Sequence, residues 1–200
     1  MILRRVFAVA VLLIPAAAEA QDGNRGSWGP PTVDYRADMV FTDDRGRSRT
    51  ARLYYTAQRQ RLEFKSGKEI VAMVYDRPAG RAFQLLLSGR SWRPVEATAP
   101  QFNFGLSDPE SRREKLADET MAGRPVAKYR VASETVTGDR FNGLAWATKQ
   151  RIVVRMAGTV MRGSKTQPLT LELKNLKIGP VDPTLFAVPA GYRKLPPLKK

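Results

Sequence analysis

Apolar and polar residues alternate along much of this chain, and this alternation restricts its possible fold more than any other feature. Val33, Tyr35, Ala37, Met39 and Phe41 are apolar at every second position, with mostly polar residues between them. Successive side chains of a β-strand point to opposite sides, so a period of two indicates a strand with one face in water. The same pattern returns further along, and the sequence therefore predicts a protein built mainly of strands.

Turn-forming residues divide the chain into short segments. Residues 43–46 (Asp-Asp-Arg-Gly) follow the first strand and predict a hairpin with a second strand at 50–56. Many short strands with closely spaced turns favour an antiparallel sheet, sandwich or barrel. The segment 70–75 is apolar on both faces, as expected for a central strand covered on both sides. Further strands are predicted at 62–64, 83–87, 126–132, 144–148, 152–157 and 169–176.

Helix signals are few, and the predicted fold class is mainly β (α+β) with a single curved antiparallel sheet. Residues 107–110 (Ser-Asp-Pro-Glu) combine a cap residue, a proline and an acid, which predicts a short helix over 109–115. Residues 182–186 (Asp-Pro-Thr-Leu-Phe) predict one capped turn that directs Phe186 into the core.

The first 20 residues have the features of a secretory signal peptide. Arg4 and Arg5 precede a short apolar run at 6–14, and small residues at Ala18 and Ala20 predict cleavage before Gln21. The alternative is an uncleaved membrane anchor, but the apolar run is shorter than the roughly 20 residues that span a bilayer. We therefore expect export to the periplasm. The predicted organisation is a signal peptide at 1–20, a flexible linker at 21–32, one β domain at 33–193 and a basic tail at 194–200.

The chain contains no His and no Cys, which excludes several classes of active site within it. Neither a Ser-His-Asp triad nor a thiol nucleophile can form, and Cys-ligated zinc is excluded as well. Asp34 and Asp38 could form a carboxylate pair, but Arg36 and Arg52 favour a solvated face with cross-strand ion pairs. We predict no catalytic residue, metal ligand or cofactor, and expect that the protein is not an enzyme.

Basic residues predict the kind of partner. The chain has 34 Lys and Arg against 19 Asp and Glu, a formal net charge of +15. Six arginines lie in a stretch without an acid, and we predict that they contact an anionic surface such as lipid phosphates. The alternative is an arginine-biased composition on an ordinary surface. Nucleic acid is not expected as a partner of an exported protein. The six are Arg45, Arg47, Arg49, Arg52, Arg59 and Arg61.

Apolar residues on the predicted strands suggest a ligand surface. A curved antiparallel sheet can wrap its inner face around a ligand, and Met and aromatic side chains adapt well to an acyl chain. The alternative is that the same side chains simply fill the core. The predicted ligand-binding face consists of Tyr35, Met39, Phe41, Leu53, Tyr55, Phe83, Leu85 and Trp92.

Three segments resemble the LolA-like superfamily of periplasmic proteins, which includes outer-membrane lipoprotein carriers and RseB-like sensors. They are residues 33–39 (VDYRADM), 119–131 (ETMAGRPVAKYRV) and 182–192 (DPTLFAVPAGY). The resemblance implies an unclosed half-barrel whose concave apolar side, partly plugged by helix, holds acyl chains. Residues 23–31 are rich in Gly and Pro and cannot form the amphipathic helix that begins such carriers. A separate branch of the superfamily is therefore expected.

Together these features predict a periplasmic protein that binds or carries a lipid, a lipoprotein acyl chain or another amphiphile. The alternative is an envelope protein-interaction or stress-sensing module that has no ligand. A hydrolase is the least supported hypothesis, because no cluster of acids marks an active site. The sequence leaves the oligomeric state open.

Overall fold

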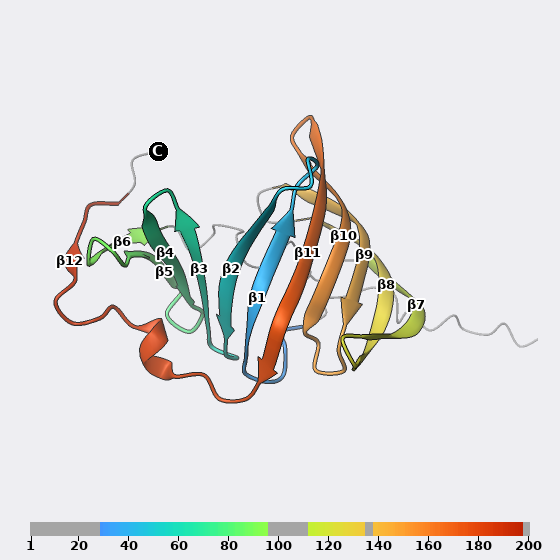
Figure 1. The fold of residues 1–200 in the computed structure, drawn as a ribbon, viewed down its shortest axis with the longest axis horizontal. Helices are drawn as coiled ribbons and strands as arrows, with labels where there is room; N and C mark the ends of the chain where they lie inside the picture. Colours follow the sequence, from blue (N-terminus) through green and yellow to red (C-terminus); the bar gives the residue numbers. More distant parts are fainter. Residues whose placement is uncertain (1–28, 96–111, 135–137, 198–200) are drawn as a thin grey trace, which may run out of the picture.

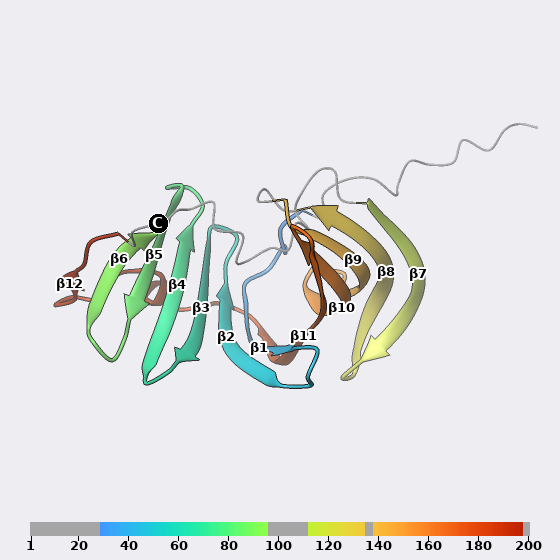
Figure 2. The same cartoon turned by 90° about the horizontal axis from the view of Figure 1, so that it is seen from above.

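The computed structural model describes residues 29–95, 112–134 and 138–197. These residues form one 12-stranded sheet in the order β12-β6-β5-β4-β3-β2-β1-β11-β10-β9-β8-β7. Neighbouring strands run antiparallel, except that β12 is parallel to β6. The sheet is curved and does not close, because β12 and β7 lie at opposite ends (Figures 1 and 2). The predicted fold class, a mainly β protein with an unclosed curved sheet, is confirmed.

The strands fall into two runs along the chain, joined where β1 pairs with β11. The only helix among the described residues is the short 3₁₀ helix η1 (Pro183–Phe186), and no described helix is long and apolar enough to span a membrane. The strands are β1 (Tyr35–Thr42), β2 (Ser48–Tyr55), β3 (Arg59–Ser66), β4 (Glu69–Asp76), β5 (Arg81–Leu86), β6 (Ser91–Val95), β7 (Arg112–Met121), β8 (Arg124–Glu134), β9 (Arg140–Ala147), β10 (Val153–Arg162), β11 (Lys165–Ile178) and β12 (Arg193–Lys194).

The predicted hairpin between the first two strands is present. β1 and β2 pair without a register shift from Tyr35 opposite Tyr55 to Thr42 opposite Ser48. Asp43 closes the turn, because its Oδ1 accepts hydrogen bonds from the backbone N–H groups of residues 45 and 47 at 3.0 and 2.9 Å. An Asp at the start of a tight turn supplies this acceptor from its own short side chain.

The second run, β7 to β11, curls strongly in Figure 2. Gly143 of β9 lies opposite Gly158 of β10. A Cβ added at Gly143 would lie 2.4 Å from the carbonyl oxygen of Ala157 and 2.7 Å from Cα of Gly158. Only a residue without a side chain fits there, since real Cβ atoms do not approach other atoms so closely. The glycine pair therefore permits the close approach of the two backbones within the curl.

Buried apolar side chains form two clusters. The large cluster joins β1–β3 to β8–β11 and contains Tyr35, Leu53 and Tyr55. The small cluster lies on the other side of β2, β4 and β5, with Tyr54, Ala72, Val74, Leu85 and Phe186. Alternation along β2 explains the division, because neighbouring residues of one strand point to opposite faces. β4 is buried on both faces, as the sequence predicts for segment 70–75.

Residues 181–195, here called the C-terminal strap, cover the small cluster. The side of the sheet that they cover is called the strap face. Asp182 caps η1, and its Oδ1 accepts hydrogen bonds from Thr184 N and Oγ1 at 2.9 and 2.7 Å. Phe186 is buried against the sheet, which confirms the capped turn predicted from the sequence. The strap ends in β12, which is paired with β6 and is visible at the edge of the sheet in Figure 1.

The helix predicted over 109–115 is wrong where the structure describes it. Arg112 begins β7 and lies opposite Ala132, and Glu114 of the same strand forms an ion pair with Arg130 of β8. Strand pairing with β8 outweighs the local cap signal, as tertiary contacts regularly do for a short segment. Residues 109–111, the signal peptide at 1–20 and most of the linker at 21–32 lie outside the described residues.

Candidate functional site

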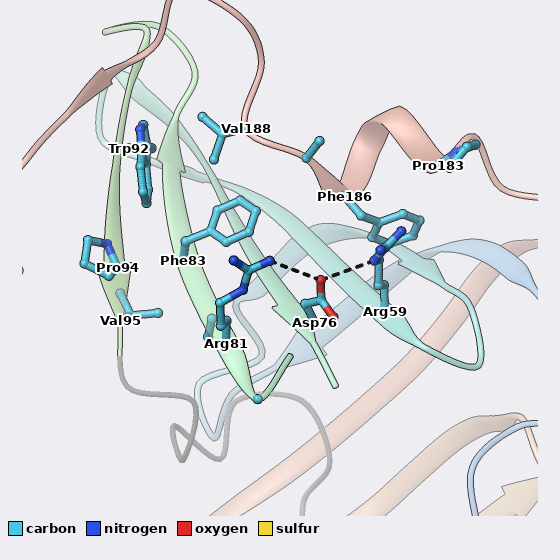
Figure 3. Close-up of a pocket in the computed structure, with 13 residues that line it drawn as sticks. Arg59, Asp76, Arg81, Phe83, Trp92, Pro94, Val95, Pro183, Phe186 and Val188 are labelled. Carbon is cyan, nitrogen blue, oxygen red and sulfur yellow. Dashed lines mark ion pairs between the residues drawn. The ribbon is translucent and has the colours of Figure 1, made fainter. Parts of the chain in front are cut away.

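A pocket of about 550 Å³ lies between the strap face of β3–β6 and the C-terminal strap. Its volume is within the range of about 300–1,000 Å³ that is usual for small-molecule sites. Segments more than 80 residues apart along the chain form its walls, so only the folded molecule creates it. Figure 3 shows its lining, with the strap on one side and strands on the other.

One part of the pocket wall is apolar. Phe83 of β5 and Trp92 of β6 meet edge to face with their ring centroids 6.1 Å apart. Pro94 lies opposite Phe83 in the ladder, and Phe186 and Val188 approach from the strap (Figure 3). Rings and branched side chains of this kind offer a surface that suits hydrocarbon and excludes water.

The other part of the pocket wall is charged. Arg59 of β3, Asp76 of β4 and Arg81 of β5 lie directly opposite one another across three neighbouring strands. Asp76 Oδ2 is 3.4 Å from Arg59 Nε and 3.7 Å from Arg81 Nη2 (Figure 3). Asp76 Oδ1 accepts a hydrogen bond from the backbone N–H of Ala79 at 3.3 Å. We call Arg59, Asp76 and Arg81 the charged triad; its formal charge is +1.

The pocket combines the two surfaces that an amphiphile requires. Its apolar side suits a hydrocarbon group, and its charged side suits a polar head group. Asp76 is the single carboxylate among the residues that line it. No group of three acidic side chains capable of holding a metal ion occurs in the part of the chain that the structure describes.

The eight residues predicted to form one ligand-binding face lie on two faces. Tyr35, Met39, Phe41, Leu53 and Tyr55 belong to or pack against the large cluster. The remaining three, Phe83, Leu85 and Trp92, belong to or pack against the small cluster under the strap. Alternation fixes which residues of one strand share a face, but it does not say which faces of successive strands coincide. The expectation of a single face is therefore wrong, and Phe83 and Trp92 lie in the pocket.

The tyrosines of the large cluster fill the core, which is the alternative to a ligand-binding face. The rings of Tyr35 and Tyr55 stack with centroids 5.0 Å apart, and Arg77 lies over the Tyr55 ring. Burial, with the nearby Tyr55 hydroxyl as a smaller cause, raises the pKa of Tyr35 far above its ordinary value. Tyr35, Tyr55 and Leu53 are buried, whereas Met39 and Phe41 are half-buried.

The six arginines predicted to contact an anionic surface do not form one patch. Arg61 is buried and donates to Glu63 Oε1 at 2.7 Å and to the carbonyl oxygen of Leu185 at 2.5 Å. Arg59 belongs to the charged triad. The others, Arg45, Arg47, Arg49 and Arg52, are exposed on the β1–β2 hairpin.

Two of the exposed arginines have acidic partners on a neighbouring strand or in the turn. Arg52 lies opposite Asp38, with Nε 3.9 Å from Oδ1, so the cross-strand ion pair predicted for this face is present. Arg47 donates to Asp43 Oδ2 at 2.8 Å and lowers the pKa of that carboxyl. Although the stretch 45–61 contains no acid, the fold brings Asp38 and Asp43 next to its arginines.

Sequence reasoning missed Asp76 and Arg81. A signal for them does exist, because the two residues flank the turn at 77–80 symmetrically and a hairpin places such residues opposite each other. The partner in the third position, Arg59, is fixed by the longer-range register between β3 and β4. That register follows from the turn at residues 67–68, which the sequence marks with Gly67.

This chain matches known proteins in structure and not in sequence. No protein-family model matches the chain, and no curated protein matches it in sequence. An uncharacterized conserved protein from Thermus thermophilus matches with a TM-score of 0.53 at 12% identity, over 82% of this chain and 90% of that one. MucB matches with a TM-score of 0.51 at 14% identity, over 80% of this chain and 59% of the MucB chain.

A structure of MucB in complex with MucA(peri) has a TM-score of 0.47 at 14% identity, over 78% of this chain and 55% of that one. The chain thus spans about three fifths of MucB or less. Identities this low bear on the fold alone. This chain shares its fold with MucB and with the Thermus protein.

Proposed function

We propose that this protein is a periplasmic binding protein for an amphiphile, such as a lipid or a lipoprotein acyl chain, and that it is not an enzyme. The pocket under the C-terminal strap is the observation that carries the proposal. It has the volume of a ligand site, an apolar wall and a charged wall, and it lies between the strands of the sheet and the C-terminal strap.

The hydrocarbon part of the ligand would lie against Phe83, Trp92 and Val188. Removing apolar surface from water contributes about 25 cal/mol per Å². The two rings pack edge to face against each other, which restrains their rotamers before binding and reduces the entropy lost on binding. The apolar wall can therefore supply binding free energy without rearrangement of the strands.

Binding is favoured over catalysis by the chemistry of the pocket lining. General acid–base catalysis usually needs two proton-transferring groups, or one group next to a nucleophile. The lining supplies a single carboxylate, Asp76, between two arginines, and the chain has no His or Cys. The periplasmic location rests on the signal peptide predicted at residues 1–20.

Native mass spectrometry tests the proposal. The protein is expressed with its own signal peptide and purified without detergent. We expect a population with additional mass that organic extraction removes and that corresponds to a lipid or other amphiphile. Absence of such a mass, together with no binding of added short-chain amphiphiles, would contradict the proposal.

Tryptophan fluorescence locates the bound molecule. Trp92 lines the pocket. Trp146 of β9 lies outside the pocket lining, and its indole Nε1 donates to Glu119 Oε2 of β7 at 2.8 Å. Trp28, the third tryptophan, is replaced by Phe in every protein used. We expect titration with decyl maltoside below its micelle concentration to change the emission of this protein and of the same protein with Trp146→Phe. The Trp92→Phe variant should lose that change. A change that survives Trp92→Phe would place the ligand elsewhere.

The second candidate function is an interaction module, and the edge of the sheet favours it. β7 is a ten-residue end strand with mostly exposed side chains, and no described strand pairs with its outer side. An unpaired strand edge can add a strand from another chain. If β7 binds another chain in this way, a photo-crosslinker at Asp118 of β7 should capture an envelope partner in cells. The same crosslinker at Arg162 of β10 is the control and should capture none.

A further inference from the structure

We propose that the pocket selects an amphiphile with a singly charged anionic head group, bound by Arg59 and Arg81 of the charged triad. This inference rests on the proposed function, because it concerns the head group of the same ligand. A fatty-acid carboxylate and the phosphodiester of a phospholipid both present such an anion, and the experiment below separates these sources.

The charge balance of the triad is the first argument. Two guanidinium groups face one carboxylate, which leaves one positive charge at a wall of the pocket. Asp76 is nearly buried, with its side chain 10% exposed, while the side chain of Arg81 is 71% exposed. An entering anion can therefore reach Arg81 from solvent without displacing Asp76.

Unused hydrogen-bonding capacity is the second argument. Both arginines approach the same Asp76 oxygen, at 3.4 and 3.7 Å, whereas charge-assisted hydrogen bonds are usually about 2.7–2.9 Å long. Arg59 Nε is buried and makes no hydrogen bond within the described part of the chain. A buried donor of this kind is stabilised when an acceptor reaches it, and an anionic head group supplies several acceptors.

The position of the triad relative to the apolar wall is the third argument. In Figure 3 the charged side chains lie beside Phe83 and Phe186, with Trp92 and Val188 further along the same pocket. One molecule can therefore place its head at Arg81 and its hydrocarbon chain at the rings. A cationic head group would face two arginines, and a doubly charged anion would leave one charge close to Asp76.

Calorimetric titration with four decyl compounds below their micelle concentrations tests the inference. Decanoate and decyl methyl phosphate, a phosphodiester, carry singly charged anionic head groups, decyl maltoside is neutral and decyltrimethylammonium is cationic. We expect the anions to bind about tenfold or more tightly than decyl maltoside, and the cation most weakly. The ratio of decanoate to decyl methyl phosphate affinity then distinguishes the carboxylate from the phosphodiester source.

Three variants assign the selectivity to the triad. Arg81→Gln should lower the ratio of decanoate to decyl maltoside affinity about tenfold. Asp76→Asn should raise that ratio, since it removes the competing charge and keeps the Oδ1 acceptor for Ala79 N–H. Arg162→Gln is the matched control: Arg162 is 77% exposed and paired with one aspartate, Asp139, on a distant hairpin, and it should leave the ratio unchanged.

The outcomes separate this inference from the proposed function. Equal affinity for all four compounds, or anion selectivity that survives Arg81→Gln combined with Arg59→Gln, would overturn the head-group assignment and leave amphiphile binding intact. Failure of all four compounds to bind, with no co-purifying lipid, would overturn both. Circular dichroism of each variant separates loss of binding from loss of the fold.

Discussion

Leu53 shows at the scale of one residue how the large cluster stabilises the fold. Its side chain is 2% exposed in β2, between β1 and β3. We predict that Leu53→Ala lowers the free energy of unfolding by about 2–5 kcal/mol, the usual effect of a cavity in a packed core. Urea denaturation measures the change. Leu116 of β7 is 38% exposed, and Leu116→Ala should cost less than about 0.5 kcal/mol. Equal losses for both variants would contradict the assigned burial.

Asp182 gives the C-terminal strap a pH dependence. Hydrogen bonds from the Thr184 side chain and backbone N–H lower the pKa of this carboxyl below its ordinary value. The folded state thus favours the ionised form, and the cap contributes fully above the ordinary pKa of about 3.9. Its contribution is lost as the pH falls through the lowered pKa.

Carbon-detected NMR titration of Asp182 checks this prediction. We expect a midpoint below the ordinary range in the native protein and a return towards it in Thr184→Val, which lacks the hydroxyl donor. A midpoint that is identical in the two proteins would show that the side-chain hydrogen bond is not the main cause.

The pocket shows how far single residues could be predicted. Phe186 was assigned to the core by its capped turn, and the structure confirms this. The sequence indicates Arg59 as an anion contact but not its grouping with Asp76 and Arg81, because the three come from different strands and the pairing of Arg59 with Asp76 requires the β3–β4 register. Local patterns reveal a hairpin pair such as Asp76 and Arg81. They do not reveal that the strap lies over this pair and completes the pocket.

The strands β9 and β10 depend on the glycine pair between them. We predict that Gly143→Ala destabilises the protein by about 1–3 kcal/mol, because the added Cβ would overlap the backbone of β10. Thermal unfolding followed by circular dichroism measures the effect. Gly89→Ala is the control, since the nearest atoms to its Cβ would lie at 3.5 and 3.6 Å. If the two variants behave alike, the close approach of the backbones is not required.

Element positions were predicted well, and element faces were not. Period-two alternation located β1 and β2 to within two residues at each end, because a strand with one buried face repeats with the pleat. The continuous apolar run at 70–75 located β4 equally well. Alternation failed at 112–115, where the start of β7 has mostly exposed side chains on both faces and thus no alternation to read. Which face of β5 and β6 joins the small cluster depends on the strap, and no local pattern encodes that contact.

At the scale of the whole molecule, Arg61 connects the strap to the sheet. It is buried, binds Glu63 and donates to the carbonyl oxygen of Leu185 in η1. We predict that Arg61→Met lowers the free energy of unfolding by about 3–5 kcal/mol, because it leaves Glu63 without its partner. Limited proteolysis should show faster cleavage of the strap in this variant.

The double variant Arg61→Met with Glu63→Leu separates the two contributions. Removing both charges should recover most of the stability lost in Arg61→Met, since no unpaired carboxylate remains. Cleavage of the strap should stay fast, because the hydrogen bond to Leu185 is still missing. Recovery of both properties would mean that the arginine does not hold the strap.

The pairing of β1 with β11 has a consequence for the newly made chain. Among the described strands β1 emerges first, whether from the ribosome or from the export machinery, but its second neighbour, β11, is complete only at Ile178. Until then the β1–β6 meander and the β7–β10 ladder can form only from local hairpins, each with an open edge at the future joint. An open edge pairs readily with other strands, so the interval between the emergence of β1 and that of β11 exposes this chain to aggregation.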